Sequence, residues 1–223
     1  MHSVARRPQA ILRRVAKPPR PSWFYLLVGA VSWPIVKILF RHRAYDVEKI
    51  PSEGGFVLAA NHSSNFDPWP LGIPLYPRRF LRFMAKAELF WFPLGAIISA
   101  GGAFRVRRGE QDEEALATAV ALCRAGHAVV MFPEGTRRQK GLRKRHEARW
   151  RTGAARIALD ADVPLMPAAI AGADRLARLG PLRVRYGDPI PLDDLAELPR
   201  ADAARAATDR LEHAVAALEE SLA

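Results

Sequence analysis

The order of apolar and polar positions predicts two kinds of element that alternate along most of the chain. Short apolar runs bounded by glycine, proline or polar residues indicate buried strands within residues 54–61, 78–86, 101–109, 127–135, 163–172 and 182–190. Helical spacing of apolar positions predicts helices at 111–126, 152–162 and about 201–222. Such alternation is typical of a mostly parallel sheet covered on both faces. We therefore predict a single α/β domain over residues 41–223, with a mostly parallel central sheet flanked by helices.

The N-terminal part of the chain follows a different pattern. Residues 1–21 are rich in arginine, lysine and proline, which predicts a basic flexible arm. Residues 22–40 are apolar, with aromatic ends, cationic flanks and an internal proline, Pro34. No cleavage site of a signal peptide follows, and the length is marginal for a full span, while a buried core helix stays an alternative. We favour a membrane-associating helical segment that lies in the interface and is divided by Pro34.

A second strongly apolar and aromatic stretch covers residues 89–102. It predicts either a core helix or a second surface that touches lipid. Cys123, the only cysteine, lies in the helix predicted at 111–126 and reads as a small apolar filler. A single cysteine excludes an intramolecular disulfide and permits a reducing compartment.

Charge narrows the class of partner. The chain has 34 Lys plus Arg against 23 Asp plus Glu, a net charge of +11, which suits nucleic acid, anionic lipid or a phosphorylated substrate. Residues 137–151 hold eight cations against Glu147 alone. This run could face lipid head groups, hold a phosphate-rich acyl donor, or be a solvated basic loop. Its single aromatic residue, Trp150, and the lack of a nucleic-acid-binding module argue against nucleic acid as the partner.

Polar residues directly follow the strand predicted at 54–61, where ligands bind in parallel sheets. Within residues 61–68, Asn61 is predicted to cap a short helix whose dipole keeps His62 neutral, and Asp67 is predicted to orient the imidazole. On one continuous helix, residues five apart point about 140° from each other. The pair therefore requires Pro68 to move Asp67 out of the helical region. The alternative is a capped turn with an exposed histidine.

The neighbouring serines, Ser63 and Ser64, lack the glycine elbow of a serine nucleophile.

Two further predicted strands end in cationic turns. In residues 132–137, Gly135 allows backbone angles that other residues rarely adopt. Arg137 has a planar guanidinium that is suited to binding a phosphate. Glu134 is suited to pairing with an arginine or to accepting a hydrogen bond from a hydroxyl. Arg107 and Arg108 form the second such end. Each turn alone could equally be a surface arginine beside a turn.

Taken together, these blocks resemble the glycerolipid acyltransferases typified by 1-acylglycerol-3-phosphate acyltransferase. NHSSNFD is similar to the family's His-x4-Asp block, GAFRVRRG to its second block, FPEGTR to its third and VPLMPAAI to its fourth. The blocks occur in the family's order over roughly residues 45–190.

The resemblance implies roles for particular residues. His62 would be the general base and Asp67 its orienting partner, while Arg108 would be the arginine of the second block. Substrate binding would also involve the acceptor turn: Glu134, Gly135, Thr136 and Arg137. Residues 163–170 would help to line the acyl or acceptor pocket, and no metal or cofactor would be required.

The implied reaction moves a fatty acyl group from acyl-CoA or acyl carrier protein to the free hydroxyl of 1-acylglycerol-3-phosphate (lysophosphatidic acid), giving phosphatidic acid for phospholipid biosynthesis. Membrane lipids are then the expected partners, at the cytoplasmic face of the cell membrane, with a peripheral or monotopic attachment. Alternatives are an acyltransferase for another lysolipid acceptor, or a non-catalytic lipid-binding protein of the same fold.

Overall fold

A seven-stranded β-sheet forms the centre of the protein, with the strand order β1-β7-β6-β2-β5-β3-β4. The computed structural model describes residues 21–106, 112–135 and 150–223. The strands are β1 (Arg43–Tyr45), β2 (Phe56–Ala60), β3 (Leu81–Lys86), β4 (Ala103–Val106), β5 (Ala128–Met131), β6 (Leu165–Ala171) and β7 (Arg183–Tyr186). The five neighbours from β6 to β4 are parallel, whereas β7 is antiparallel to β6 and parallel to β1. The prediction of a mostly parallel sheet is confirmed.

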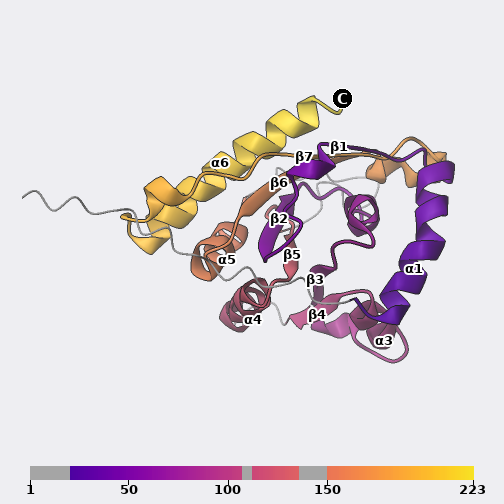
Figure 1. Cartoon of the computed structure of the whole chain (residues 1–223), viewed down its shortest axis with the longest axis horizontal. Helices are drawn as coiled ribbons and strands as arrows, with labels where there is room; N and C mark the ends of the chain where they lie inside the picture. Colours follow the sequence, from indigo (N-terminus) through magenta and orange to yellow (C-terminus); the bar gives the residue numbers. More distant parts are fainter. Residues whose placement is uncertain (1–20, 107–111, 136–149) are drawn as a thin grey trace, which may run out of the picture.

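Helices cover both faces of this sheet (Figure 1). The α-helices are α1 (Trp23–Pro34), α2 (Pro68–Gly72), α3 (Leu94–Ala100), α4 (Asp112–Arg124), α5 (Gly153–Ala161) and α6 (Arg200–Glu220). Short 3-10 helices connect them: η2 (Val47–Lys49), η3 (Ile73–Leu75), η4 (Ala87–Leu89), η6 (Ala173–Arg178) and η7 (Asp193–Leu195). Helices α4, α5 and α6 lie on one side of the strands, and α1 lies on the other.

Strand β2 shows why the apolar runs of the sequence do not alternate with polar residues. Val57 and Ala59 belong to the core cluster that also contains residues of α4, α5 and α6. Phe56, Leu58 and Ala60 belong to the opposite cluster, which contains residues of α2 and η3. All five residues are fully buried. A strand covered on both faces needs apolar side chains in both directions, as in other parallel sheets.

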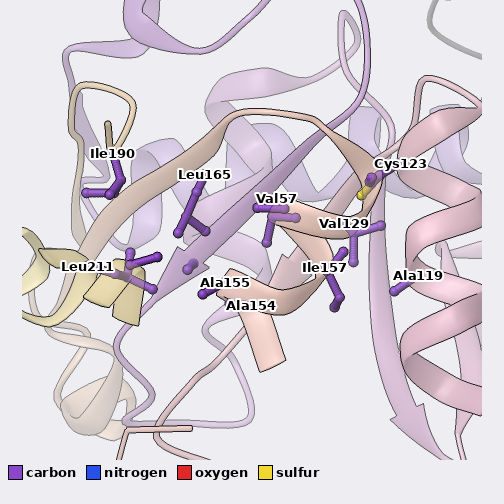
Figure 2. Packing of buried hydrophobic residues seen from close by; sticks show 14 of the residues in the cluster. Val57, Ala119, Cys123, Val129, Ala154, Ala155, Ile157, Leu165, Ile190 and Leu211 are labelled. Carbon is purple, nitrogen blue, oxygen red and sulfur yellow. The ribbon is translucent and has the colours of Figure 1, made fainter. Parts of the chain in front are cut away.

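The cluster beneath α4, α5 and α6 packs small residues against branched ones (Figure 2). Alanines on α5, such as Ala154 and Ala155, have no exposed surface and allow the helix to approach the sheet closely. Cys123 also lies in this cluster with 1% of its surface exposed. Burial raises the pKa of its thiol to about 12. The predicted role of Cys123 as an apolar filler is confirmed.

The apolar N-terminal segment consists of two helical elements that meet at Pro34, as predicted, although the chain stays helical through the proline. Helix α1 ends at Pro34 and continues directly into a π-helix, η1 (Ile35–Leu39). Both Pro34 and Ile35 have right-handed helical backbone angles. A proline removes one helical hydrogen bond, and the wider hydrogen-bonding pattern of a π turn accommodates that loss without ending the helix.

Two apolar stripes run along α1 and η1. One stripe faces the domain: Tyr25 packs edge-on against Phe80 with ring centroids 4.5 Å apart, and Val36 is buried. On the same stripe, Gly29 lies so close to the Tyr76 ring that an added Cβ would be 2.3 Å from it. The other stripe is exposed and consists of large apolar side chains at helical spacing: Trp23, Leu27, Val31, Ile35 and Ile38.

The stretch at residues 89–102 contains α3, and two of its three aromatic residues before that helix are exposed. Trp91 is 59% exposed and Phe92 is 88% exposed. This end of the domain is close to the start of α1, because the Ser22 hydroxyl donates to the Ala100 carbonyl over 3.2 Å. In the described part of the chain, no helix combines the length and the apolar character needed to cross a membrane.

Some predicted segments lie outside the residues that the structure describes. Residues 1–20 of the predicted basic arm and residues 137–149 of the basic run are not among the described residues. Strand β1, in contrast, is described but was not predicted. It has three residues, RAY, at the edge of the sheet, with one exposed and two half-buried positions. Such a short edge strand carries little apolar pattern.

We expect one buried histidine to make the stability of the fold depend on pH. His42 is 4% exposed, and its Nε2–H donates to the Pro70 carbonyl over 3.1 Å. Burial, with the nearby Lys37 charge, lowers its pKa from 6.5 to about 4. The unfolded chain therefore takes up a proton at higher pH than the fold does, so stability falls as the pH falls through this interval. The free energy of unfolding should drop by roughly 2–3 kcal/mol from this group between about pH 7.5 and about pH 4.5.

Denaturant unfolding at the two pH values measures this loss. The matched variant is His42→Gln, whose amide keeps a donor for the Pro70 carbonyl but does not titrate. The pH dependence of the variant should be smaller than that of the unsubstituted chain by the same amount. Equal pH dependence in the two proteins would contradict the assignment to His42.

Candidate active site

Two of the predicted polar turns lie next to each other in the structure. Strands β2 and β5 are parallel neighbours, with Ala59 paired to Met131, so their carboxyl ends are at the same edge of the sheet. Residues 61–67 follow β2, and residues 132–135 follow β5. The sheet therefore brings His62 and Asp67 close to Glu134 and Gly135.

The Asp67 carboxylate is the centre of the first turn. Its side chain has no exposed surface, and His62 Nδ1 lies 2.8 Å from Oδ2. The same oxygen accepts from the backbone N–H groups of Ser63 and Ser64 over 2.8 and 2.9 Å, and the Ser63 hydroxyl donates to Oδ1 over 3.2 Å. The predicted pairing of His62 with Asp67 is therefore present in the structure.

The geometry that makes this pair differs from the predicted one. Asp67 has helical backbone angles, φ −50° and ψ −34°, so Pro68 does not push it out of the helical region. Instead, residues 61–64 belong to no helix or strand, and residues 65–67 form a turn that leads into α2. The chain therefore folds back on itself before the helix begins, and the two backbone N–H groups wrap around the carboxylate.

The predicted helix cap at Asn61 is also wrong. Its side chain is buried and bonds to the backbone of Ile170 and to Glu219, rather than to a following helical turn. The next helix is α2, which starts at Pro68 and has five residues. His62 therefore does not lie at the start of a helix capped by Asn61, and its contact with Asp67 orients the imidazole.

The contact with Asp67 also determines which ring nitrogen of His62 carries the proton. Because the carboxylate is an acceptor, Nδ1 is the donor, and Nε2 keeps its lone pair. The ring stacks on Phe132 with centroids 4.3 Å apart and 19° between the planes. The side chain of His62 is 20% exposed, so the imidazole is held on one side and still reaches solvent. This arrangement supplies a proton acceptor at the carboxyl edge of β2.

Helix α2, which has Asp67 at its start, forms hydrogen bonds with several other parts of the domain. The buried Tyr186 hydroxyl donates to the Leu71 carbonyl over 2.7 Å, and His42 donates to Pro70. On the side of α1, the Trp69 indole N–H lies 3.4 Å from the Ser32 hydroxyl oxygen, and Phe66 stacks on Trp69 at 5.2 Å. The turn that holds Asp67 therefore contacts both the sheet and the N-terminal helix.

The turn after β5 contains one cation that sequence reasoning did not single out. Gly135 has φ +68°, and its N–H donates to the Phe132 carbonyl, which closes the turn. The Arg151 side chain lies over this glycine, so that an added Cβ would be 2.7 Å from Nε. The Arg151 N–H donates to the Pro133 carbonyl over 2.9 Å. In the sequence, Arg151 was only the last cation of the run 137–151, and nothing nearby marked it as a neighbour of Gly135.

The remaining predicted residues have different outcomes. Glu134 is described and is 3% exposed, so its carboxylate lies inside the turn. Arg108, Thr136 and Arg137 lie outside the described residues. The end of β4, which precedes Arg108, is separated from β2 by β5 and β3, or about 14 Å at ordinary strand spacing.

Within the described ranges, no three His, Cys, Asp or Glu side chains gather as a metal site requires.

Comparison with known proteins shows the family to which this chain belongs. A family model described as Acyltransferase matches residues 41–171, which contain both turns. The chain belongs to the acyltransferase family. As a member of the family, it is an enzyme that transfers acyl groups.

Individual relatives agree with this assignment. The chain is 31% identical over 186 residues to 1-acyl-sn-glycerol-3-phosphate acyltransferase of Bacillus subtilis (strain 168), covering 81% of this chain and 89% of the relative. It is 34% identical over 133 residues to a probable 1-acyl-sn-glycerol-3-phosphate acyltransferase of Mycoplasma genitalium, covering 56% of this chain and 47% of that relative.

A solved structure shares the fold. The crystal structure of the 1-acyl-sn-glycerophosphate (LPA) acyltransferase PlsC from Thermotoga maritima aligns with a TM-score of 0.63 and 23% identity, over 87% of this chain and 78% of that chain.

Proposed function

We propose that this acyltransferase moves a fatty acyl group from a thioester donor to the free hydroxyl of 1-acylglycerol-3-phosphate, giving phosphatidic acid. The observation that carries the proposal is the contact between His62 Nδ1 and the buried Asp67 carboxylate, which leaves Nε2 as a proton acceptor. The name of the Bacillus subtilis relative, 1-acyl-sn-glycerol-3-phosphate acyltransferase, supports the choice of acceptor, and the chain covers most of the length of that relative.

The reaction follows from the orientation of the imidazole. Nε2 of His62 takes the proton of the acceptor hydroxyl while that oxygen attacks the thioester carbonyl carbon. The tetrahedral intermediate then expels the thiolate, which takes the proton back from the imidazolium and leaves as a free thiol. Asp67 stabilises the positive charge on the ring between the two steps. General-base help of this kind contributes about 10²–10⁴-fold, and the positions of the two substrates supply much of the rest.

The phosphate of the acceptor requires a cation close to His62. Arg151 lies over Gly135, and the turn that contains Gly135 begins at Phe132, on which the His62 ring stacks. A guanidinium can bind a phosphate monoester through two parallel hydrogen bonds. We assign Arg151 to this role together with Arg137, which belongs to the same turn in the sequence.

The exposed stripe of α1 and η1 is the surface that we assign to the membrane. Its five large apolar side chains face away from the domain, and the exposed Trp91 and Phe92 add to the apolar surface of the protein. A helix with such a stripe lies in the interface, with its apolar face in the acyl region of one leaflet. We therefore propose a peripheral or monotopic attachment at the cytoplasmic face, where thioester donors and the lipid acceptor meet.

Other acceptors and a non-catalytic role are the competing functions. A lysolipid without a free phosphate would use the same His62 chemistry but would not need Arg151. A lipid-binding protein without activity would not need the His62–Asp67 contact. The two substitutions below distinguish these cases.

Replacing the proposed base tests catalysis. His62→Ala should lower the turnover number by about 10³-fold or more, because the acceptor hydroxyl loses its proton acceptor. Release of free thiol from acyl-CoA in the presence of 1-acylglycerol-3-phosphate measures the turnover. His213→Ala, which removes an exposed histidine on α6, is the matched control and should keep normal turnover. Normal turnover in His62→Ala would rule out the proposed base.

Replacing the proposed phosphate-binding cation tests the acceptor. Arg151→Ala should raise the KM for 1-acylglycerol-3-phosphate by about tenfold, because a charge-assisted contact to phosphate is lost. The KM for the acyl donor should change little, and so should the rate with monoacylglycerol, which has no phosphate. Arg205→Ala, at an exposed position on α6, is the control. An equal rise in KM for donor and acceptor would contradict phosphate binding by Arg151.

Replacing the exposed stripe tests membrane attachment. The triple variant Trp23→Ser, Leu27→Ser and Val31→Ser should lower the fraction bound to vesicles by about tenfold or more, because three large apolar contacts with lipid are lost. Its Tm should stay close to normal, since these side chains do not pack on the domain. Leu198→Ser removes another exposed apolar side chain and should bind normally. Unchanged sedimentation of the triple variant with vesicles would exclude this stripe as the anchor.

A further inference from the structure

Asn61, the residue before the proposed base, has a buried side chain with three hydrogen bonds. It is 3% exposed. Its Nδ2 donates to the Ile170 carbonyl over 2.9 Å and to Glu219 Oε1 over 2.8 Å, and its Oδ1 accepts from the Ile170 N–H over 2.8 Å. Both N–H bonds of the amide are therefore in use, and only asparagine offers this set of donors and acceptor in so short a side chain.

These bonds extend the pairing of β2 with β6 by one residue beyond the last backbone pair of the two strands. The ladder between β2 and β6 ends where Ala60 is paired with Ala168, although β6 runs on to Ala171. The Asn61 side chain then bonds to both backbone groups of Ile170, as a strand residue would. His62 is the next residue, so its backbone is held on one side by Asn61 and on the other by the bonds of Ser63 and Ser64 to Asp67.

Glu219 connects this arrangement to the last helix. It lies one residue before the end of α6 and is half-buried, and its carboxylate accepts from the second N–H of Asn61. A carboxylate is an acceptor only, so it directs the amide nitrogen of Asn61 toward α6. The amide oxygen is then left for the Ile170 N–H. Flipping of the amide would place its oxygen against the carboxylate and would break all three bonds.

We propose that Glu219 and Asn61 are positioning residues through which α6 fixes the orientation of the His62 imidazole. Neither touches the reacting atoms: Glu219 orients Asn61, and Asn61 orients the backbone of His62. The inference rests on the acyl transfer proposed above for its effect on rate, but its structural part can be measured without turnover.

The structural measurement follows the His62 Nδ1–H proton, which is bonded to Asp67, by proton NMR of the full chain. The resonance is assigned by its loss in Asp67→Asn. Glu219→Ala should broaden or shift it, whereas Glu219→Gln should keep it, because the glutamine Oε1 still accepts from Asn61. Glu220→Ala is the matched control, since this exposed neighbour on α6 carries the same charge. An unchanged resonance in Glu219→Ala would overturn the proposal, whatever the activity of the protein.

The kinetic measurement separates positioning from substrate binding. Glu219→Ala should lower kcat by about tenfold with both KM values within about twofold, which corresponds to the loss of one hydrogen bond acting on the base. Asn61→Asp should lower kcat more strongly, by about 10²-fold, because two carboxylates then face each other. The double variant Asn61→Asp with Glu219→Gln should recover at least about fivefold of that loss, since glutamine can donate to the new carboxylate.

Two results would count against the kinetic part. One is a kcat of Glu219→Ala equal to that of Glu220→Ala. The other is a loss of rate that follows only the fraction of folded protein. A lack of thiol release in the unsubstituted chain would instead reject the proposed function, and the proton resonance would still decide whether Glu219 positions His62.

Discussion

The structure of the site depends on one buried anion. Asp67 has no exposed surface, and moving a carboxylate out of water is costly unless donors replace the lost hydration. Here the carboxylate accepts hydrogen bonds from four donors: His62 Nδ1, two backbone N–H groups and the Ser63 hydroxyl. The same bonds that compensate the buried charge also shape the loop and orient the imidazole. Removal of the carboxylate would therefore affect the local fold and the proton acceptor together.

The parallel sheet determines where this carboxylate can be. Parallel strands end at a common edge, and both faces of the sheet are covered, so polar groups can gather only beyond the strand ends. β2 and β5 are neighbours, which places the His62 ring against Phe132 and the glycine turn beside it. The end of β4 is two strands further away than that of β5. Groups that follow β2 and β5 are therefore close enough to contact one small chemical group, whereas the end of β4 lies further along the same edge of the sheet.

The sequence was sufficient for six of the seven strands and for the partner of His62, but for different reasons. Apolar runs such as residues 56–60 must be buried wherever they lie, so local composition is enough to find them. The pair of His62 and Asp67 was found although the supposed reason, a helix broken at Pro68, is wrong. The real cause is the set of backbone donors around the carboxylate, which depends on the path of the loop and leaves no trace in residue spacing.

Contacts between distant parts of the chain were the ones that sequence reasoning missed. Asn61 bonds to Ile170 and Glu219, which lie 109 and 158 residues away. An asparagine at the end of a strand is a common cap, and only the neighbouring strand and helix show that it is part of the sheet instead. Arg151 was missed for the same reason. Its spatial neighbour Gly135 precedes the basic run to which Arg151 belongs. A run of like charges does not indicate which of its residues lies at the site.

The position of α1 explains how a lipid substrate could reach a base at the end of a buried sheet. α2 begins at the turn that holds Asp67, and its Trp69 contacts Ser32 on α1. His42, just after η1, bonds to Pro70 on α2. The helix that presents an apolar stripe to the outside is therefore in direct contact with the segment that holds the dyad. An acceptor whose acyl chain stays in the leaflet has its hydroxyl close to the lipid surface. Under the proposed function, a base on a loop packed against the helix that we assign to the membrane is within reach of that hydroxyl, whereas a base at the opposite edge of the sheet would be the length of a strand away.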